Sequence, residues 1–146
     1  MSRIAVYRVF DFEEGELRGR TGLEWPGAEL VAEYRKIEGL STERARVLAR
    51  EHLSEQACMC GIHGYFDPNM VTGFGQSSSI DRGDSALART VLGGLVDVHE
   101  EGARGEYALI EEMWAAPWIA AWLSEKFGVP VNRTPYEDLP MLEPMI

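Results

Sequence analysis

The sequence of 146 residues predicts a single α+β domain with a mainly antiparallel sheet and two or three helices. Several short segments rich in β-branched and aromatic residues are separated by turns with glycine, proline or acidic residues, which is typical of strands joined as hairpins. Two other segments have apolar side chains at helical spacing and start with residues that begin helices. The length fits one domain, expected over residues 1–134, followed by a Pro-rich, acidic tail at 135–146.

The N-terminal part of the chain predicts strands. Residues 4–12 are β-branched and aromatic, and they form the first expected strand. The acidic residues 13–16 are expected to turn the chain, so that residues 17–20 return as the second strand of a hairpin. A Trp-Pro-Gly turn at 25–27 then precedes a further strand expected at 29–35.

The first helix is expected to begin at Ser41 or Thr42, both good helix-capping residues, and to end near His52. Glu43 in its first turn suits the positive end of the helix dipole. Its apolar face carries Ala45, Leu48, Ala49 and His52. A strand over residues 62–66 is expected after the segment that contains the cysteines.

A long hairpin is expected in the second half of the chain. Residues 88–99 are apolar and β-branched around a Gly-Gly pair at 93–94, which predicts a strand with a bulge. Glu100-Glu101-Gly102 is expected to turn the chain. Residues 106–110 then continue either as a strand or as the start of a helix.

The last expected helix covers residues 118–127, because Pro117 fits its first position and Gly128 ends it. A short, edge-like strand follows at 129–131. Three tryptophans precede or lie within this region at a spacing of four, namely Trp114, Trp118 and Trp122. They are interpreted as a core-facing stripe, and the alternative is an exposed surface for a partner protein.

The charge of the chain indicates which kinds of partner it can bind. Its 24 acidic and 14 basic side chains give a net charge of −10, which repels nucleic acid and acidic membranes. A basic partner protein is favoured electrostatically, unless the charge serves solubility alone. No apolar run approaches the roughly 20 residues of a membrane span, and the N-terminus lacks a signal-peptide pattern. We therefore expect a cytoplasmic protein with reduced thiols.

Both cysteines and one of the three histidines occur in the stretch Cys58-Met59-Cys60-Gly61-Ile62-His63. Together with His52 the spacing is His-x5-Cys-x-Cys-x2-His, and zinc prefers four ligands of these types. In extended backbone both sulfurs face one side, over which His52 can fold back. The fourth ligand stays open between His63, which a regular strand points away from Cys60, and His99 from a neighbouring strand.

Two alternatives to a zinc site remain for these residues. The cysteines can be buried and inert, as free cysteines often are. Cys60 can instead be a nucleophile assisted by His63 and His99. If zinc is bound by four side chains the site is structural, whereas three ligands and a water would permit hydrolysis.

Residues 59–66, Met-Cys-Gly-Ile-His-Gly-Tyr-Phe, resemble the start of class II glutamine amidotransferases. The resemblance implies an N-terminal cysteine nucleophile at Cys60, and the Arg-Gly pair at 82–83 is similar to a downstream segment of that family. The amidotransferase mechanism uses the free α-amine of the cysteine, whereas 59 residues precede Cys60 here. We therefore interpret the match as a local similarity.

A second resemblance covers most of the chain. The order of motifs is similar to that in a family of small uncharacterised actinobacterial and actinophage proteins. The matching positions are Tyr7-Arg8-Val9, Trp25-Pro26, His52, Cys58-x-Cys60-Gly61-Ile62-His63, Gly94-Leu95-Val96 and His99-x-x-Gly102-x-Arg104-Gly105-x-x-Ala108. The family has a further cysteine where this chain has Tyr34. If that cysteine is a zinc ligand, the resemblance implies that His63 or His99 replaces it here, or that this member binds no metal.

These observations leave three functional hypotheses. The first is a small regulatory or protein-interaction module, plausibly phage-encoded, that is stabilised by a zinc site; it is favoured because no complete catalytic constellation is present. The second is a zinc- or cysteine-dependent hydrolase that uses Cys60 with His63 and His99. The third is an acidic inhibitor of a basic nucleic-acid-binding protein.

Overall fold

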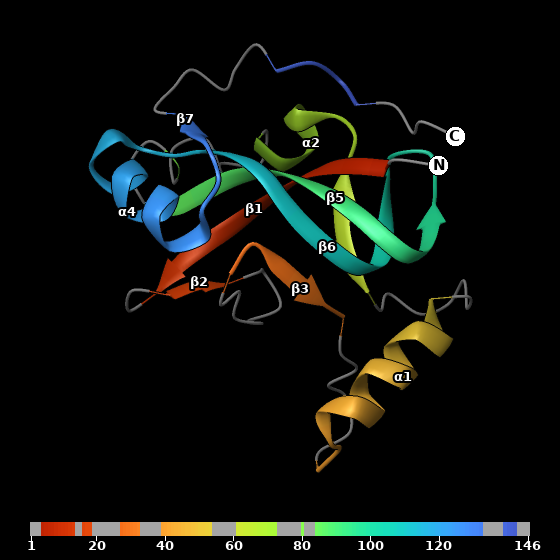
Figure 1. Cartoon of the computed structure of the whole chain (residues 1–146). Helices are drawn as coiled ribbons and strands as arrows, with labels where there is room; N and C mark the ends of the chain where they lie inside the picture. Colours follow the sequence, from red (N-terminus) through yellow and green to blue (C-terminus); the bar gives the residue numbers. More distant parts are fainter. Residues whose placement is uncertain are drawn as a thin grey trace.

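The computed structural model describes residues 4–13, 16–18, 27–32, 39–53, 61–72, 80, 84–132 and 139–142. It confirms a mainly antiparallel α+β fold (Figure 1). The elements in chain order are β1 (Ile4–Glu13), β2 (Glu16–Arg18), β3 (Glu29–Val31), α1 (Thr42–His52), β4 (Ile62–Tyr65), α2 (Pro68–Thr72), β5 (Ser85–Val98), β6 (Gly102–Trp114), α4 (Pro117–Phe127) and β7 (Val131–Asn132).

The sheet is organised around the long hairpin of β5 and β6. One edge of β6 pairs with β5, and the other edge pairs in succession with β4, β3 and β7. Strand β1 pairs with β5 along one edge, and with β4 and β2 along the other. Strands β1, β5, β6 and β4 therefore close a ring, and among the described strands only β7 runs parallel to its neighbour.

Side chains alternate between two apolar clusters on the two faces of β1. Val6 and Phe10 belong to the larger cluster, which fills the inside of the sheet together with residues of β5 and β6 such as Leu92 and Ile110. The smaller cluster lies on the opposite face, and its buried members are Tyr7, Val9, Ile80, Leu87 and Trp114. The sheet is thus packed on both faces over part of its length.

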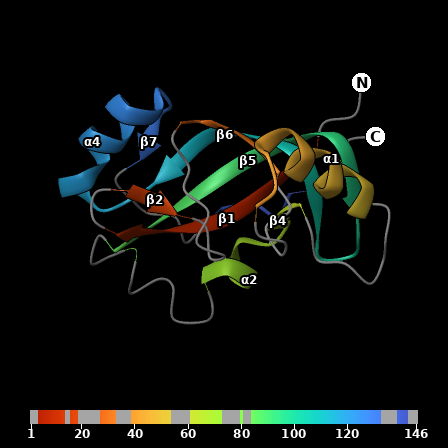
Figure 2. The same cartoon turned by 90° about the horizontal axis from the view of Figure 1, so that it is seen from below.

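Local capping explains where the two long helices begin and end. The Ser41 hydroxyl accepts a hydrogen bond from the Arg44 amide at 3.1 Å and caps α1, as predicted. Pro117 starts α4, and Gly128 ends it in the left-handed region with φ of 66°. The two helices lie at opposite ends of the molecule (Figures 1 and 2).

One alternative is resolved and one prediction needs correction. Residues 106–110 are part of strand β6, which confirms the strand alternative for this segment. The interpretation of the tryptophans as a core-facing stripe is wrong, because Trp118 and Trp122 are exposed on α4. Only Trp114 is buried, and it lies at the end of β6, before the Pro117 that starts the helix.

Part of the expected tail lies against the sheet. The Tyr7 hydroxyl donates a hydrogen bond to the Pro140 carbonyl at 2.8 Å, and the Leu142 amide donates to the Phe66 carbonyl at 2.8 Å. Leu139 and Leu142 pack against the smaller apolar cluster. Residues 139–142 therefore cover one half of this face of the sheet.

Candidate functional site

The predicted metal ligands divide into two groups in the structure. Cys58 and Cys60 lie outside the described residues, whereas the three histidines lie within them. His52 is the last residue of α1 and His63 is in β4, so these two histidines flank the cysteine segment. Their elements are in contact, because a Cβ added to Gly61 would lie 2.7 Å from the Leu53 Cδ2 atom.

Arg104 of β6 joins the two histidine-bearing elements. It is buried, and its Nη2 donates a hydrogen bond to the Leu53 carbonyl at the end of α1, at 3.2 Å. In the sheet Arg104 pairs with His63 of β4 on one side and with Asp97 of β5 on the other. The Arg104 Nε also donates to the Asp97 carboxylate at 2.9 Å, so His63, Arg104 and Asp97 form one cross-strand row.

A second guanidinium lies beside His63. Nη1 of Arg8 donates a hydrogen bond to the His63 carbonyl at 2.7 Å, and the Arg8 guanidinium stacks 5.2 Å above the Phe10 ring. Burial lowers the pKa of Arg8 to about 10, which still leaves it charged at neutral pH.

His99 lies apart from the other two histidines. It is exposed at the turn between β5 and β6, where its amide donates to the Gly102 carbonyl at 2.9 Å. Strand β6 lies between His99 and β4, a lateral separation of about 10 Å for two strand spacings. Within the described residues no group of three His, Cys, Asp or Glu side chains can hold a metal ion. A metal at this position therefore requires ligands from outside the described residues, such as Cys58 and Cys60.

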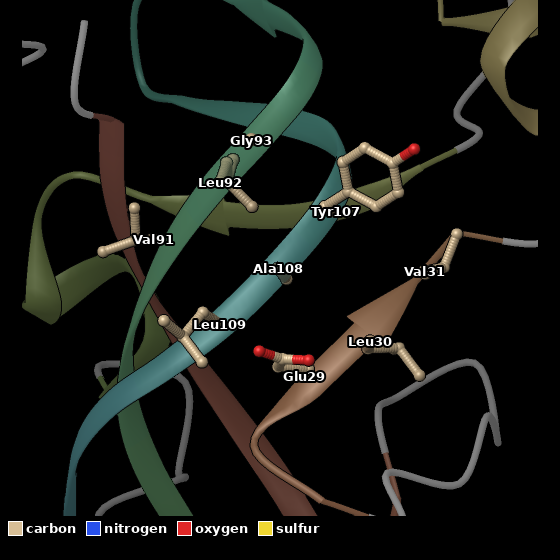
Figure 3. Close-up of a pocket in the computed structure, with 9 residues that line it drawn as sticks. All are labelled: Glu29, Leu30, Val31, Val91, Leu92, Gly93, Tyr107, Ala108 and Leu109. Atoms are coloured by element: carbon tan, nitrogen blue, oxygen red, sulfur yellow. The ribbon is translucent and has the colours of Figure 1, made fainter. Parts of the chain in front are cut away.

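A second candidate site, which the sequence did not predict, is an apolar pocket of about 350 Å³ on the outward face of the sheet (Figure 3). Tyr107 and Leu109 of β6 lie at its centre and are 46% and 43% exposed. The lining comes from three neighbouring strands and comprises Glu29, Leu30, Val31, Val91, Leu92, Gly93, Tyr107, Ala108 and Leu109.

The Gly-Gly bulge shapes this pocket. Gly93 pairs with Tyr107 and Val96 pairs with Gly105, so β5 has one extra residue there. Gly94 has φ of 70°, and a Cβ at this position would lie 2.6 Å from the Tyr107 ring. The Glu106 carboxylate accepts a hydrogen bond from the Leu95 amide at 3.2 Å and holds the bulge. The bulge was predicted, but its contact with Tyr107 is set by the sheet register.

Among the described residues of the pocket lining, Glu29 alone carries a charge. It is exposed on β3, opposite Leu109, and its carboxylate pairs with no side chain or amide in the part of the chain that the structure describes. In Figure 3 its carboxylate lies beside Leu109 at one end of the pocket. The pocket thus combines an apolar floor with a single negative charge.

By its architecture the chain is an α+β domain with a closed ring of antiparallel strands and an apolar pocket on the outer sheet face. No protein-family model, curated protein or solved structure matches it. Among the described residues, no helix combines the length and apolar character needed to cross a bilayer.

Proposed function

We propose that this chain is a small protein-interaction module that binds an extended, basic segment of a partner protein at the pocket. The observation that carries the proposal is the exposed apolar pocket, lined by Tyr107, Leu109 and Val91, with the carboxylate of Glu29 at its end. Exposed apolar surface of this kind is typical of protein-binding sites.

The geometry of β3 supports an extended ligand. In the ladder with β6, the Ala32 amide donates to the Glu106 carbonyl and the Ile110 amide donates to the Ala28 carbonyl, both at 2.8 Å. Even-numbered residues of β3 therefore direct their backbone groups to β6, and Glu29 and Val31 direct theirs away from it. Among the described strands β3 pairs with β6 only, so a partner segment can add to this free edge.

Charge supports a basic partner. The net charge of −10 attracts cationic segments over a distance, and the Glu29 carboxylate can pair with a lysine or arginine at the pocket. Apolar side chains of the same segment would contact Tyr107 and Leu109. Because Glu29, Leu109 and Tyr107 share one face of the sheet, the expected ligand carries its basic and apolar residues two positions apart, on one face of the strand.

A titration with two synthetic peptides tests this proposal. The uniformly labelled protein is titrated with acetyl-Lys-Ser-Val-Ser-Lys-Ser-Val-amide, whose lysines and valines share one face of a strand, and with its Glu-for-Lys counterpart, and amide chemical shifts are recorded by NMR. We expect saturable shifts at Val31, Tyr107 and Leu109 with the lysine peptide only. Leu109→Lys should abolish them, whereas Val98→Lys, at an apolar position of similar exposure outside the pocket, should not. Equal binding by both variants would refute the assignment of the pocket.

We also propose that Cys58, Cys60, His52 and His63 hold a structural zinc ion, in a reducing compartment such as the cytoplasm. The positions of His52 and His63 at the two ends of the cysteine segment support this ligand set, and the separation of His99 disfavours it as a ligand. Zinc would tie the end of α1 to the start of β4.

Elemental analysis of the untagged protein tests the zinc proposal separately from the pocket. We expect about one zinc per chain, lost in the variants His52→Ala and His63→Ala and kept in the matched control His99→Ala. A metal-free protein with two titratable thiols would contradict the proposal. The hydrolase and acidic-inhibitor hypotheses stay predictions, because Cys60 lies outside the described residues and no described contact selects either activity.

A further inference from the structure

Helix α4 carries an aromatic stripe on the side that faces away from the sheet. Trp118 and Trp122 are 67% and 40% exposed, and Glu125 is exposed as well. These residues follow each other at spacings of four and three, so they share one face of the helix. Trp118 is thus a large apolar side chain left in solvent at the end of the molecule opposite α1 (Figures 1 and 2).

The stripe lies on a helix that is packed firmly against the rest of the protein. The opposite face of α4 buries Ala120, Leu123 and Phe127 against the rest of the protein. The Gly128 amide donates to the Ser124 carbonyl at 2.8 Å and closes the helix. A binding surface on such an element loses little conformational entropy when a partner docks.

One tryptophan of the stripe already binds a cation. The Lys126 ammonium lies 4.9 Å from the centroid of the Trp122 ring, a cation–π contact. The ring of Trp118, one turn earlier, contacts no cation and no second ring among the described residues. It therefore offers an aromatic face to a cation from another molecule.

We propose that the stripe of Trp118, Trp122 and Glu125 is a second docking surface, which binds a partner segment with two arginines. One guanidinium stacks on Trp118 and the other pairs with the Glu125 carboxylate. Seven helical rises separate these positions by about 10.5 Å. An Arg-x-x-Arg segment in the polyproline II conformation has three residues per turn, so both arginines lie on one side, about 9.3 Å apart. The net charge of −10 favours this basic ligand over a second copy of the chain or an anionic membrane.

The test follows the indole N–H signals of the full chain by NMR during titration with acetyl-Arg-Ala-Ala-Arg-amide. The matched probe is the same peptide with citrulline, which is uncharged and of nearly the same shape. We expect saturable shifts of the Trp118 and Trp122 signals, and binding roughly three- to tenfold weaker for citrulline, for Trp118→Ala and for Glu125→Gln. Val98→Lys, at an exposed position outside both the pocket and α4, should bind as the unmodified chain does.

Three outcomes would overturn the proposal. The first is equal shifts with the citrulline peptide, and the second is unchanged peptide binding by Trp118→Ala. The third is a shift of the indole signals without peptide, caused by raising the protein concentration or by adding zwitterionic lipid vesicles. Because Trp118 is exposed, Trp118→Ala should keep the thermal midpoint of the unmodified chain, so a folding defect does not obscure the result. The pocket proposal is independent of this test, since its residues are on other elements.

Discussion

The two halves of the outer sheet face have similar apolar composition and different surroundings. The side chains of Leu87 and Val91 lie on the same face of β5, four residues apart. Leu87 is fully buried, whereas Val91 lines the open pocket. The Leu87 half is covered by Ile80 and residues 139–142, whereas among the described residues nothing covers the Val91 half. The same kind of strand is thus part of the core where the chain returns over it and open surface where, among the described residues, it does not.

A half-buried ion pair marks the boundary between these halves. Arg89 lies between Leu87 and Val91 along β5, and its guanidinium contacts the Glu112 carboxylate at 2.8 Å. The Asn132 amide nitrogen donates a hydrogen bond to the same carboxylate at 2.6 Å. The transition from covered to open surface therefore coincides with a polar network rather than with a break in the sheet.

The largest expected difference between the halves concerns stability. Leu87→Ala should lower the free energy of unfolding by about 2–5 kcal/mol, because it leaves a cavity under the covering segments. Leu109→Ala at the open half should change it by only about 0.5 kcal/mol. Urea denaturation of both variants measures the contrast, and equal losses would mean that the open half is also part of the core.

The Gly-Gly bulge allows a matched pair of substitutions. Gly94→Ala places a side chain at positive φ and against Tyr107, so a loss of about 1–3 kcal/mol is expected. Gly93→Ala meets no atom within 4 Å and should cost much less. Thermal denaturation distinguishes them, and similar midpoints for the two variants would contradict the described bulge.

Residues 139–142, which cover the Leu87 half, can be loosened from the sheet without a change in the pocket. Tyr7→Phe removes the hydrogen bond to the Pro140 carbonyl, and a loss of about 0.5–1.5 kcal/mol is expected. Hydrogen exchange at the Leu142 amide should accelerate, while that of Ile110 near the pocket should follow only the global change. Unaltered exchange at Leu142 would show that this hydrogen bond does not hold the segment.

The smallest expected effect is a dependence on alkaline pH. Burial raises the pKa of the Tyr7 phenol. The positive charge of Arg89 acts against this rise, and the negative charge of Glu112 adds to it. Since the folded value exceeds the unfolded value of 10.0, this contribution to stability is complete below about pH 10 and is lost as the pH rises through the folded value. Tyrosinate absorbance should show one late-ionising phenol that Tyr7→Phe lacks, and identical titration curves would exclude the shift.

Local signals in the sequence predicted much of the fold. Ser41, Pro117 and Gly128 act on neighbouring backbone groups, so the helix ends were predicted correctly. The first hairpin and the bulge also depend on nearby residues. By contrast, the closure of the ring and the order of strands along β6 depend on contacts between distant residues, which periodicity does not encode.

The candidate sites were predicted less well for the same reason. The segment with His52 and His63 was located from its composition, but its contact with Arg104 and Arg8 comes from strand pairing. The pocket joins Gly93 and Tyr107, which are brought together only by the register of β5 and β6. The tryptophan spacing was misleading because Pro117 divides the run between a strand and a helix.

The ring of strands has a consequence for biosynthesis. Beyond its local hairpin with β2, strand β1 pairs along residues 4–11 with β5, so most of this strand acquires its long neighbour only once β5 has been made. Such long-range pairing slows folding and leaves unpaired strand edges accessible in the meantime. On the ribosome, the apolar strand β1 therefore emerges long before β5 and keeps one edge open to other pairing until β5 is made.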